Sequence, residues 1–456
     1  MEKRKLAFEG VTVLTGPMWQ PMPGSTVLIN GDIIAAVSHD RDVPYPKGTR
    51  VVDCGGKFLV PGFIDMHTHC HTLEAVDFLS QFGPRIEGAE HKDWFLRLFV
   101  AHGVTALRDV GNFREIFDLR RESSDNPSAP AMFVAGELLE GPEPLWPLSR
   151  KVTDGEAARK EVRRQKELGA DWVKLYTAID LETSKAAIDE AHSLGIRVAG
   201  HIWKTTAREA ARAGIDTLEH TLTLADEDFL TDEDRAALPG AADGRYRRDR
   251  FRQAWLKADL ESDAASDLVK ALTESKTAVC PTLIVHENTI LGPDVSYQNF
   301  AYDCVPQQWL DTWEGRLKLF KPPGETLPDP VGSFEKALNL VAKLNSRGVR
   351  ILGGTDAALW NPYVVPGASL HRELELLIAA GMDVRDALSS VTCWAAETLG
   401  ASAEIGTIEE GKMADLILLN GNPLEAIRHT RAIELVVNRG YASSPEEILE
   451  SGGLGD

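Results

Sequence analysis

The sequence of 456 residues has little cysteine and no long apolar run. Its five cysteines are scattered, and none lies in a C-x-x-C pair, which excludes a disulfide framework or a thiolate zinc site and fits a reducing cytoplasm. No run of about 18 apolar residues could span a membrane, and the basic N-terminus lacks the apolar segment and cleavage site of a signal peptide. We therefore expect a cytoplasmic, unanchored protein.

Basic residues are also in deficit, with 49 Lys and Arg against 69 Asp and Glu, which gives a net charge of −20. This charge disfavours attraction to nucleic acid or to an anionic membrane surface. The chain is 43% hydrophobic and 26% charged, which is typical of globular proteins and not of disordered ones. The expected partner is a small-molecule substrate, and a homo-oligomeric state stays open.

The middle of the chain repeats one unit three times: a capped helix, a glycine stop, and a short apolar strand that ends in a polar residue. The strands ADWVKLY, IRVAGH and IDTLEH carry Lys174, His201 and His220. Thr206 and Glu209 form a capping-box pattern before the third helix. This strict alternation predicts parallel strands joined by helices.

Five further segments extend the pattern to eight strands within residues 58–402: FLVPGFIDMH, VTALRDV, AMFVAG, AVCPTLIV and VRILGG. Eight such units predict an α/β fold with a closed parallel (β/α)₈ barrel, or TIM barrel. Chemistry in this fold lies at the carboxyl ends of the strands. Residues 226–262 and 287–333 are long for barrel loops, and their role as lids or as surface segments stays open.

The two ends of the chain follow a different pattern. Residues 1–57 and 403–442 alternate in hydropathy and break at Gly and Pro, as short antiparallel strands do. We predict one composite β-sandwich built from both termini, with the barrel inserted between its halves. Residues 443–456 are expected to form a surface helix and a C-terminal tail.

Polar residues that could bind a metal recur at the predicted strand ends. In DMHTHCH, His67 and His69 are two positions apart, so their rings leave an extended strand on the same side. An H-x-H pair alone is weak evidence, but other candidate ligands fall at the ends of strands four, five, six and eight, which would meet at one barrel mouth. These are Lys174, His201, His220 and Asp356.

Lys174 is unusual among these residues because it carries a positive charge on an apolar strand, VKLY. An ammonium about 4 Å from a divalent cation would be repelled by about 8 kcal/mol at an effective dielectric constant of about 20. Carboxylation by carbon dioxide would instead give a carbamate that can bridge two cations. The alternative is a lysine paired with a neighbouring acid.

Together these motifs resemble the metal-dependent amidohydrolase superfamily, near its imidazolonepropionase and prolidase-like branch. The resemblance rests on FLVPGFIDMHTH, GADWVKLY, VAGH, TLEHT, GGTDA and GTIEEGKMADLILLNGNPL. It implies a binuclear centre in which His67, His69 and Asp356 hold one ion and His201 and His220 the other. It also implies an N6-carboxylysine at Lys174 that bridges both ions.

The resemblance further implies hydrolysis by a metal-bridging hydroxide, with Asp356 as the catalytic residue that transfers the proton. Zinc is the first choice of metal, although manganese, cobalt or iron would accept the same ligands.

Four more residues are candidates for contact with the substrate: Tyr176, His286, Arg108 and Trp203. His286, after PTLIV, would bind substrate or its developing oxyanion, against a loop-capping alternative. Tyr176 would touch substrate or fill the barrel, and Trp203 would wall the pocket. Arg108 would bind a carboxylate of the substrate, or pair with Asp109 or another local acid.

The leading hypothesis is hydrolysis of an amide bond in a dipeptide or an N-acyl amino acid. The chain departs from prolidases after Lys174, because LYT replaces their Ser-Gly-Gly stretch. Hydrolysis of a cyclic amide or a lactone is the first alternative. A mononuclear deaminase or imidazolonepropionase is another, although Lys204 stands where deaminases of this fold carry glutamate. A metal-free scaffold protein would require missing ligands, and all six positions are filled.

Overall fold

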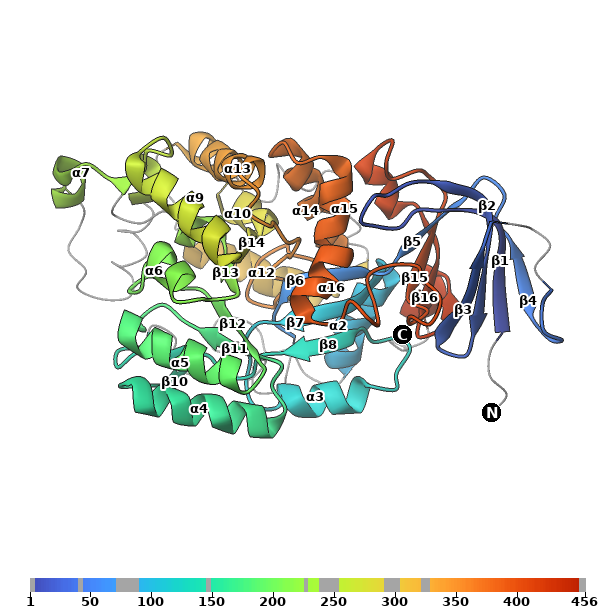
Figure 1. Ribbon diagram of the computed structural model, residues 1–456, viewed down its shortest axis with the longest axis horizontal. Coiled ribbons are helices and arrows are strands. Elements are labelled where there is room, and N and C mark those ends of the chain that lie inside the picture. Colours follow the sequence, from blue (N-terminus) through green and yellow to red (C-terminus); the bar gives the residue numbers. More distant parts are fainter. Residues whose placement is uncertain are drawn as a thin grey trace.

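The computed structural model describes residues 5–39, 44–70, 90–144, 149–224, 229–237, 254–290, 304–320 and 329–450. Figure 1 shows a sheet at one end of the molecule and a larger body of helices and strands at the other. Among the residues just given, no helix is long and apolar enough to cross a membrane.

The sheet at one end combines strands from both ends of the chain. Its strands are β1 (Lys5–Val13), β2 (Met22–Asn30), β3 (Ile33–Ser38), β4 (Arg50–Asp53), β5 (Phe58–Pro61), β15 (Leu416–Leu419), β16 (Ile433–Asn438) and β17 (Tyr441–Ser443). Their order is β17-β16-β15-β5-β1-β2-β3, with β4 paired to β1. Val60 of β5 faces Ile417 of β15 in antiparallel register, so this pair joins the two chain ends.

This sheet encloses a core of its own, which includes Phe8, Val27, Leu59 and Leu418. It supports the sandwich-like unit expected from the two termini. One strand prediction was wrong, because FLVPGFIDMH is not a single strand: β5 ends at Pro61 and joins the terminal sheet, and the next strand starts at Phe63. Gly62 separates the two strands.

The larger body contains two parallel sheets. The first has the order β6 (Phe63–Thr68), β7 (Val104–Asp109), β8 (Ala131–Val134). The second has the order β10 (Arg150–Lys151), β9 (Leu139–Glu140), β11 (Trp172–Leu175), β12 (Arg197–Gly200), β13 (Thr217–Glu219), β14 (Ala278–Cys280). The segment at residues 351–357 lies between them, since Ile351 bridges Val279 and Ala357 bridges Thr68. The predicted mixed α/β fold with parallel strands is thus confirmed.

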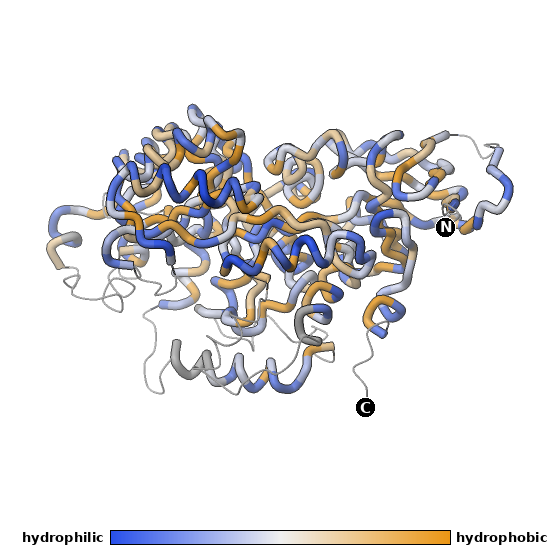
Figure 2. The backbone as a smooth tube through the Cα atoms, turned by 90° about the horizontal axis from the view of Figure 1, so that it is seen from below, coloured by the Kyte–Doolittle hydropathy of each residue, from blue (hydrophilic) through white to orange (hydrophobic). Residues whose placement is uncertain are grey.

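Helices follow most of these strands and cover them. Their bounds are α2 (Glu90–Ala101), α3 (Ile116–Ser123), α4 (Gly155–Leu168), α5 (Leu181–Ser193), α6 (Ala207–Arg212), α7 (Asp232–Ala236), α9 (Asp263–Ser275), α10 (Leu283–Ile290), α12 (Gln307–Phe320), α13 (Pro330–Ser346), α14 (Ala368–Ala379), α15 (Val384–Ser390), α16 (Cys393–Leu399) and α17 (Pro445–Glu450), with 3₁₀ turns η2 (Thr221–Thr223) and η5 (Ile427–Arg431). Figure 2 shows hydrophobic strands in the middle of the molecule and hydrophilic stretches on the outer helices.

Local signals set the ends of several helices. The capping box at α6 is confirmed, because the Thr206 hydroxyl accepts from Glu209 N–H and the Glu209 carboxylate accepts from Thr206 N–H. Gly169 ends α4 in the left-handed conformation, with φ of 99°. These local signals define the start of α6 and the end of α4.

The prediction of a seventh strand through PTLIV was wrong. Strand β14 ends at Cys280 and helix α10 begins at Leu283, so His286 lies on a helix and not at a strand end. In the second long insertion, the described part includes α12, where Trp313 is buried and donates to the carbonyl of Leu359 at 2.9 Å. Residues 226–228, 238–253, 291–303 and 321–328 of the two insertions lie outside the described residues.

Candidate metal centre

Two histidines, His67 on β6 and His69 just after it, point to the carboxylate of Asp356. His69 Nε2 lies 3.3 Å and His67 Nε2 3.5 Å from Oδ1 of Asp356. The other ring nitrogen of each histidine is already bound: His67 Nδ1 is 2.7 Å from Glu219 Oε2, and His69 Nδ1 is 2.6 Å from the carbonyl oxygen of Gly111. These acceptors assign the proton to Nδ1 and leave each Nε2 lone pair directed at the site.

The GGTDA motif explains how Asp356 comes so close. A Cβ on Gly354 would lie 2.7 Å from the backbone nitrogen of His67, so a side chain at this position would push the segment away from β6. The N–H of Asp356 then donates to the carbonyl of His67 at 2.7 Å. The glycine therefore permits the approach that brings the aspartate to the two histidines.

His201 and His220, which follow β12 and β13, continue the cluster. The ring centroids of His201 and His220 are 4.6 Å apart, and those of His220 and His67 are also 4.6 Å apart. His220 Nδ1 lies 2.7 Å from the hydroxyl of Thr282. The structure thus brings together the four histidines and the aspartate that the sequence placed at separate strand ends.

Several polar atoms in this cluster are buried without a hydrogen-bond partner among the described residues. They are His67 Nε2, His201 Nε2, Lys174 Nζ and Asp356 Oδ1. Unpaired buried polar atoms are uncommon in folded proteins and need an explanation. His67, His220 and Asp356 offer donor atoms that all lie within 4.8 Å of one another. Imidazole nitrogen with carboxylate oxygen suits zinc and similar divalent ions, so the residues fit a metal site.

Charge in the cluster matches this interpretation. Burial lowers the pKa of His67, His201 and His220 below the usual range, which favours the neutral imidazole that binds metals. His69 is the exception: burial opposes its protonation, but the nearby Asp356 carboxylate raises its pKa. Burial lowers the pKa of Lys174 on β11 to about 8, so a neutral amine is accessible near neutral pH.

A buried ion pair beneath the histidines is a feature that the sequence analysis missed. Glu219 precedes His220 and is fully buried. Its carboxylate accepts from His67 Nδ1, from the Thr217 hydroxyl at 2.6 Å and from Arg108 Nη2 at 2.8 Å. Burial would raise the pKa of Glu219, but the Arg108 charge holds it below its usual value. The sequence does contain a signal for this ion pair, because Arg108 and Glu219 both lie on apolar strands and charged residues are rarely buried without a partner.

Arg108 is consequently occupied by partners within the protein. Its Nε donates to the carbonyl of Met66 at 2.6 Å, its Nη1 to the Thr217 hydroxyl at 2.9 Å, and its guanidinium stacks 4.5 Å above the ring of Trp172. Of the two alternatives for Arg108, the structure supports pairing with a local acid. That acid is Glu219 and not Asp109.

The other candidate substrate residues lie around the histidines. The ring of Tyr176 is 4.8 Å from that of His201, and the ring of Trp203 is 5.5 Å from it. His286 lies on α10 with its ring 6.1 Å from that of His220. These three side chains therefore line the His201 and His220 side of the cluster.

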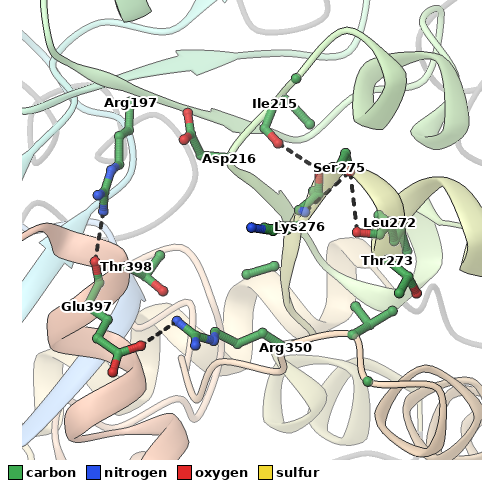
Figure 3. A pocket seen from close by; sticks show the side chains of 15 residues that line it. Arg197, Ile215, Asp216, Leu272, Thr273, Ser275, Lys276, Arg350, Glu397 and Thr398 are labelled. Atoms are coloured by element: carbon green, nitrogen blue, oxygen red, sulfur yellow. Dashed lines mark hydrogen bonds and ion pairs between the residues drawn. The ribbon is translucent and has the colours of Figure 1, made fainter.

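A pocket of about 430 Å³ lies elsewhere, at the amino ends of β12, β13 and β14 (Figure 3). The candidate metal ligands follow the carboxyl ends of the same strands. The charged lining of this pocket is largely paired: Arg350 binds the Glu397 carboxylate at 2.8 Å, and Arg197 donates to the Glu397 carbonyl at 3.1 Å. It offers no cluster of metal donors, so we place the functional site at the histidines.

Residues 58–440 match the amidohydrolase family, and the chain belongs to this family of hydrolases. A 5-methylthioadenosine/S-adenosylhomocysteine deaminase of Thermodesulfovibrio yellowstonii is 40% identical over 85 residues, which cover 18% of this chain and 19% of that enzyme. An imidazolonepropionase of Hyphomonas neptunium is 24% identical over 419 residues and 86% of each chain.

Among solved structures, a prolidase complexed with N-methylphosphonate-L-proline superposes with a TM-score of 0.70 at 22% identity. The match covers 96% of this chain and 99% of the prolidase. At this identity the likeness concerns the fold alone. The predicted family, with imidazolonepropionase relatives and prolidase-like neighbours, is confirmed.

Proposed function

We propose that this protein is a metal-dependent hydrolase that cleaves an amide bond in a small molecule. One observation carries the proposal: His67 Nε2 and His69 Nε2 converge on Asp356 Oδ1, while His201 Nε2 and Lys174 Nζ are buried beside them without hydrogen-bond partners in the described chain. Such a set of lone pairs is costly to bury unless a cation binds it. The two parallel sheets would form the predicted (β/α)₈ barrel around this site.

Two divalent ions, with zinc as the first choice, fit the number and type of donors. His67, His69 and Asp356 would hold one ion, and His201 and His220 the other. Lys174 would join both after carboxylation, in which the neutral amine forms an N–C bond to carbon dioxide and loses a proton. The lowered pKa of Lys174 supports this step, because the neutral amine is the reactive form.

Bound ions would supply a nucleophilic water at neutral pH and polarise the scissile carbonyl. The chain's own residues would complete the reaction. Asp356 would accept the proton from the attacking water and return it to the leaving nitrogen. His286 would donate to the substrate or its developing oxyanion, and Tyr176 and Trp203 would contact the substrate body.

A dipeptide or an N-acyl amino acid is the proposed substrate class. The prolidase neighbour, solved with an L-proline derivative, supports this class through the fold alone. The relatives named imidazolonepropionase favour a cyclic amide or related ring as the second candidate. A mononuclear deaminase-like enzyme is the third, and Lys204 at the position of the deaminase glutamate argues against it.

Two measurements test the proposal. Metal analysis of protein purified without chelator should find two ions per chain; one ion would support the mononuclear alternative, and none would refute metal dependence. A screen of dipeptides, N-acyl amino acids, cyclic amides and lactones on metal-replete protein should then identify the class. Loss of turnover after chelation and its return with zinc would tie the activity to the site.

The bridging role of Lys174 makes a separate prediction. Lys174→Ala should lose the binuclear centre and turnover, and short carboxylic acids should restore part of both by replacing the carbamate. Lys185→Ala is a suitable control, because this exposed lysine on α5 pairs only with Glu182 at 2.9 Å among the described contacts. Two bound ions and full turnover in Lys174→Ala would show that the bridge is wrongly assigned.

A further inference from the structure

Helix α10 begins in an unusual way for a helix next to a functional site. The first backbone N–H groups of a helix have no partner within the helix and are normally satisfied by the side chain just before it. Thr282 precedes α10 and is a residue type that often serves this role. Its hydroxyl, however, is 2.7 Å from Nδ1 of His220.

A carboxylate from another helix binds the N–H groups instead. The backbone N–H of Leu283 donates to Oε1 of Glu373 at 3.0 Å, and that of Ile284 donates to Oε2 at 2.8 Å. Glu373 lies on α14 and is fully buried. Burial raises the pKa of Glu373 to about 8, so the cap is defined by the two hydrogen bonds that its carboxyl oxygens accept and does not depend on a full negative charge. Glu373 therefore replaces the local cap and leaves Thr282 available to His220.

The segment held in this way contacts the candidate metal centre at several points. The backbone N–H of His220 donates to the carbonyl of Cys280 at 2.8 Å, and Thr221 N–H donates to that of Pro281 at 3.3 Å. Thr282 has a positive φ of 48°, a conformation that its surroundings must hold. His286 lies on the first turns of α10 and faces His220. A shift at the start of α10 would thus move both histidines.

We propose that Glu373 is a positioning residue: by capping α10 from α14, it fixes Thr282 against His220 and holds His286 at the site. The expected effects of Glu373 on metal binding and turnover rest on the proposed function. The positioning of Thr282 and His286 by Glu373 does not depend on that function. Removal of the cap would release Thr282 to bind its own helix, and His220 would lose the partner that orients its ring.

Glu287→Gln provides a matched control. Glu287 lies on α10, is also buried, and ties the same two helices together through Arg372 at 2.7 Å. It does not bind the amino end of α10. Both substitutions therefore weaken the contact between α10 and α14, and only Glu373→Gln disturbs the cap.

The test compares hydrogen exchange, metal affinity and kinetics in the two variants. Glu373→Gln should speed exchange in segments 217–224 and 281–290, lower metal affinity about tenfold or more, and lower kcat more than it raises KM. Glu287→Gln should leave exchange in 217–224 and metal affinity within twofold of wild type. Unchanged exchange in 217–224 for Glu373→Gln would overturn the proposal whether or not the protein binds metal.

Wild-type metal content and turnover, measured alongside, decide the proposed function separately.

Thr282→Val keeps the test valid if Glu373→Gln fails to fold. This near-isosteric change removes the hydroxyl on His220 and leaves the Glu373 cap in place. It should lower metal affinity with unchanged exchange in 281–290, and wild-type affinity in Thr282→Val would refute the link through Thr282.

Discussion

Removal of one partner of the ion pair between Arg108 and Glu219 should destabilise the fold strongly, because both side chains are fully buried. Arg108 Nη2 lies 2.8 Å from Glu219 Oε1, so Arg108→Met would leave a carboxylate buried without its cation. Removal of one partner of such a pair costs about 3–5 kcal/mol. Glu219→Gln should also be costly, because the guanidinium then lacks its anion.

The double variant Arg108→Met/Glu219→Gln distinguishes the pair from general packing. It removes both charges together, so its loss should be smaller than the sum of the single losses, by about 1–3 kcal/mol. Urea unfolding followed by circular dichroism, with linear extrapolation, measures each free energy of unfolding.

Arg121→Met is the matched control. Arg121 pairs with Asp118 at 2.6 Å, but both side chains are mostly exposed, so the loss should stay below about 1 kcal/mol. If the stability losses of the two single variants added up to the loss of the double variant, the coupling between Arg108 and Glu219 would be refuted. A loss below about 1 kcal/mol for Arg108→Met would refute the cost of the unpaired buried charge. A raised KM with unchanged stability would instead support the substrate-binding alternative for Arg108.

Three further predictions concern other parts of the chain. Asp356→Asn should keep the circular dichroism spectrum and lose turnover; unchanged rates would remove its proton-transfer role. Lys276 ends α9 with a positive φ of 60°, so Lys276→Gly should raise the free energy of unfolding by about 0.5–1 kcal/mol, and a lower melting temperature would contradict this. Burial raises the pKa of Asp415 to about 6, above its unfolded value near 3.8. The native state therefore binds the extra proton between these values, and stability should fall as pH rises from about 4 to 6 by about 1.4 kcal/mol per unit. Asp415→Asn should remove this part of the pH dependence in urea titrations, and an unchanged slope would contradict it.

The candidate ligands were predictable from sequence because they depend on repeated local patterns. Each unit ends its helix at a glycine and its strand at a polar residue, so Lys174, His201 and His220 fall at corresponding places. Parallel strands then bring corresponding places together, whatever their separation in sequence. The centroid distances of 4.6 Å between neighbouring rings agree with that expectation.

The start of α10 and the Arg108–Glu219 pair follow from long-range contacts, which local patterns do not contain. The run PTLIV has the apolar and β-branched residues of a strand. A helix begins there instead, and Glu373, about ninety positions later, accepts its first N–H groups. Likewise, the acid that neutralises Arg108 lies 111 positions away, while Asp109 is adjacent. Local propensity therefore failed where distant side chains satisfy the backbone or a charge.

Backbone strain at the site has the same long-range origin. His220, Thr282 and Asp356 have positive φ angles of 65°, 48° and 58°, a region that costs residues other than glycine about 1–3 kcal/mol each. Hydrogen bonds to other strands hold two of them: His220 N–H donates to Cys280, and Asp356 N–H donates to His67. The strain turns these side chains toward the cluster, and the surrounding fold stabilises it. Weakening those inter-strand contacts should consequently disorder the donor set before it unfolds the sheets.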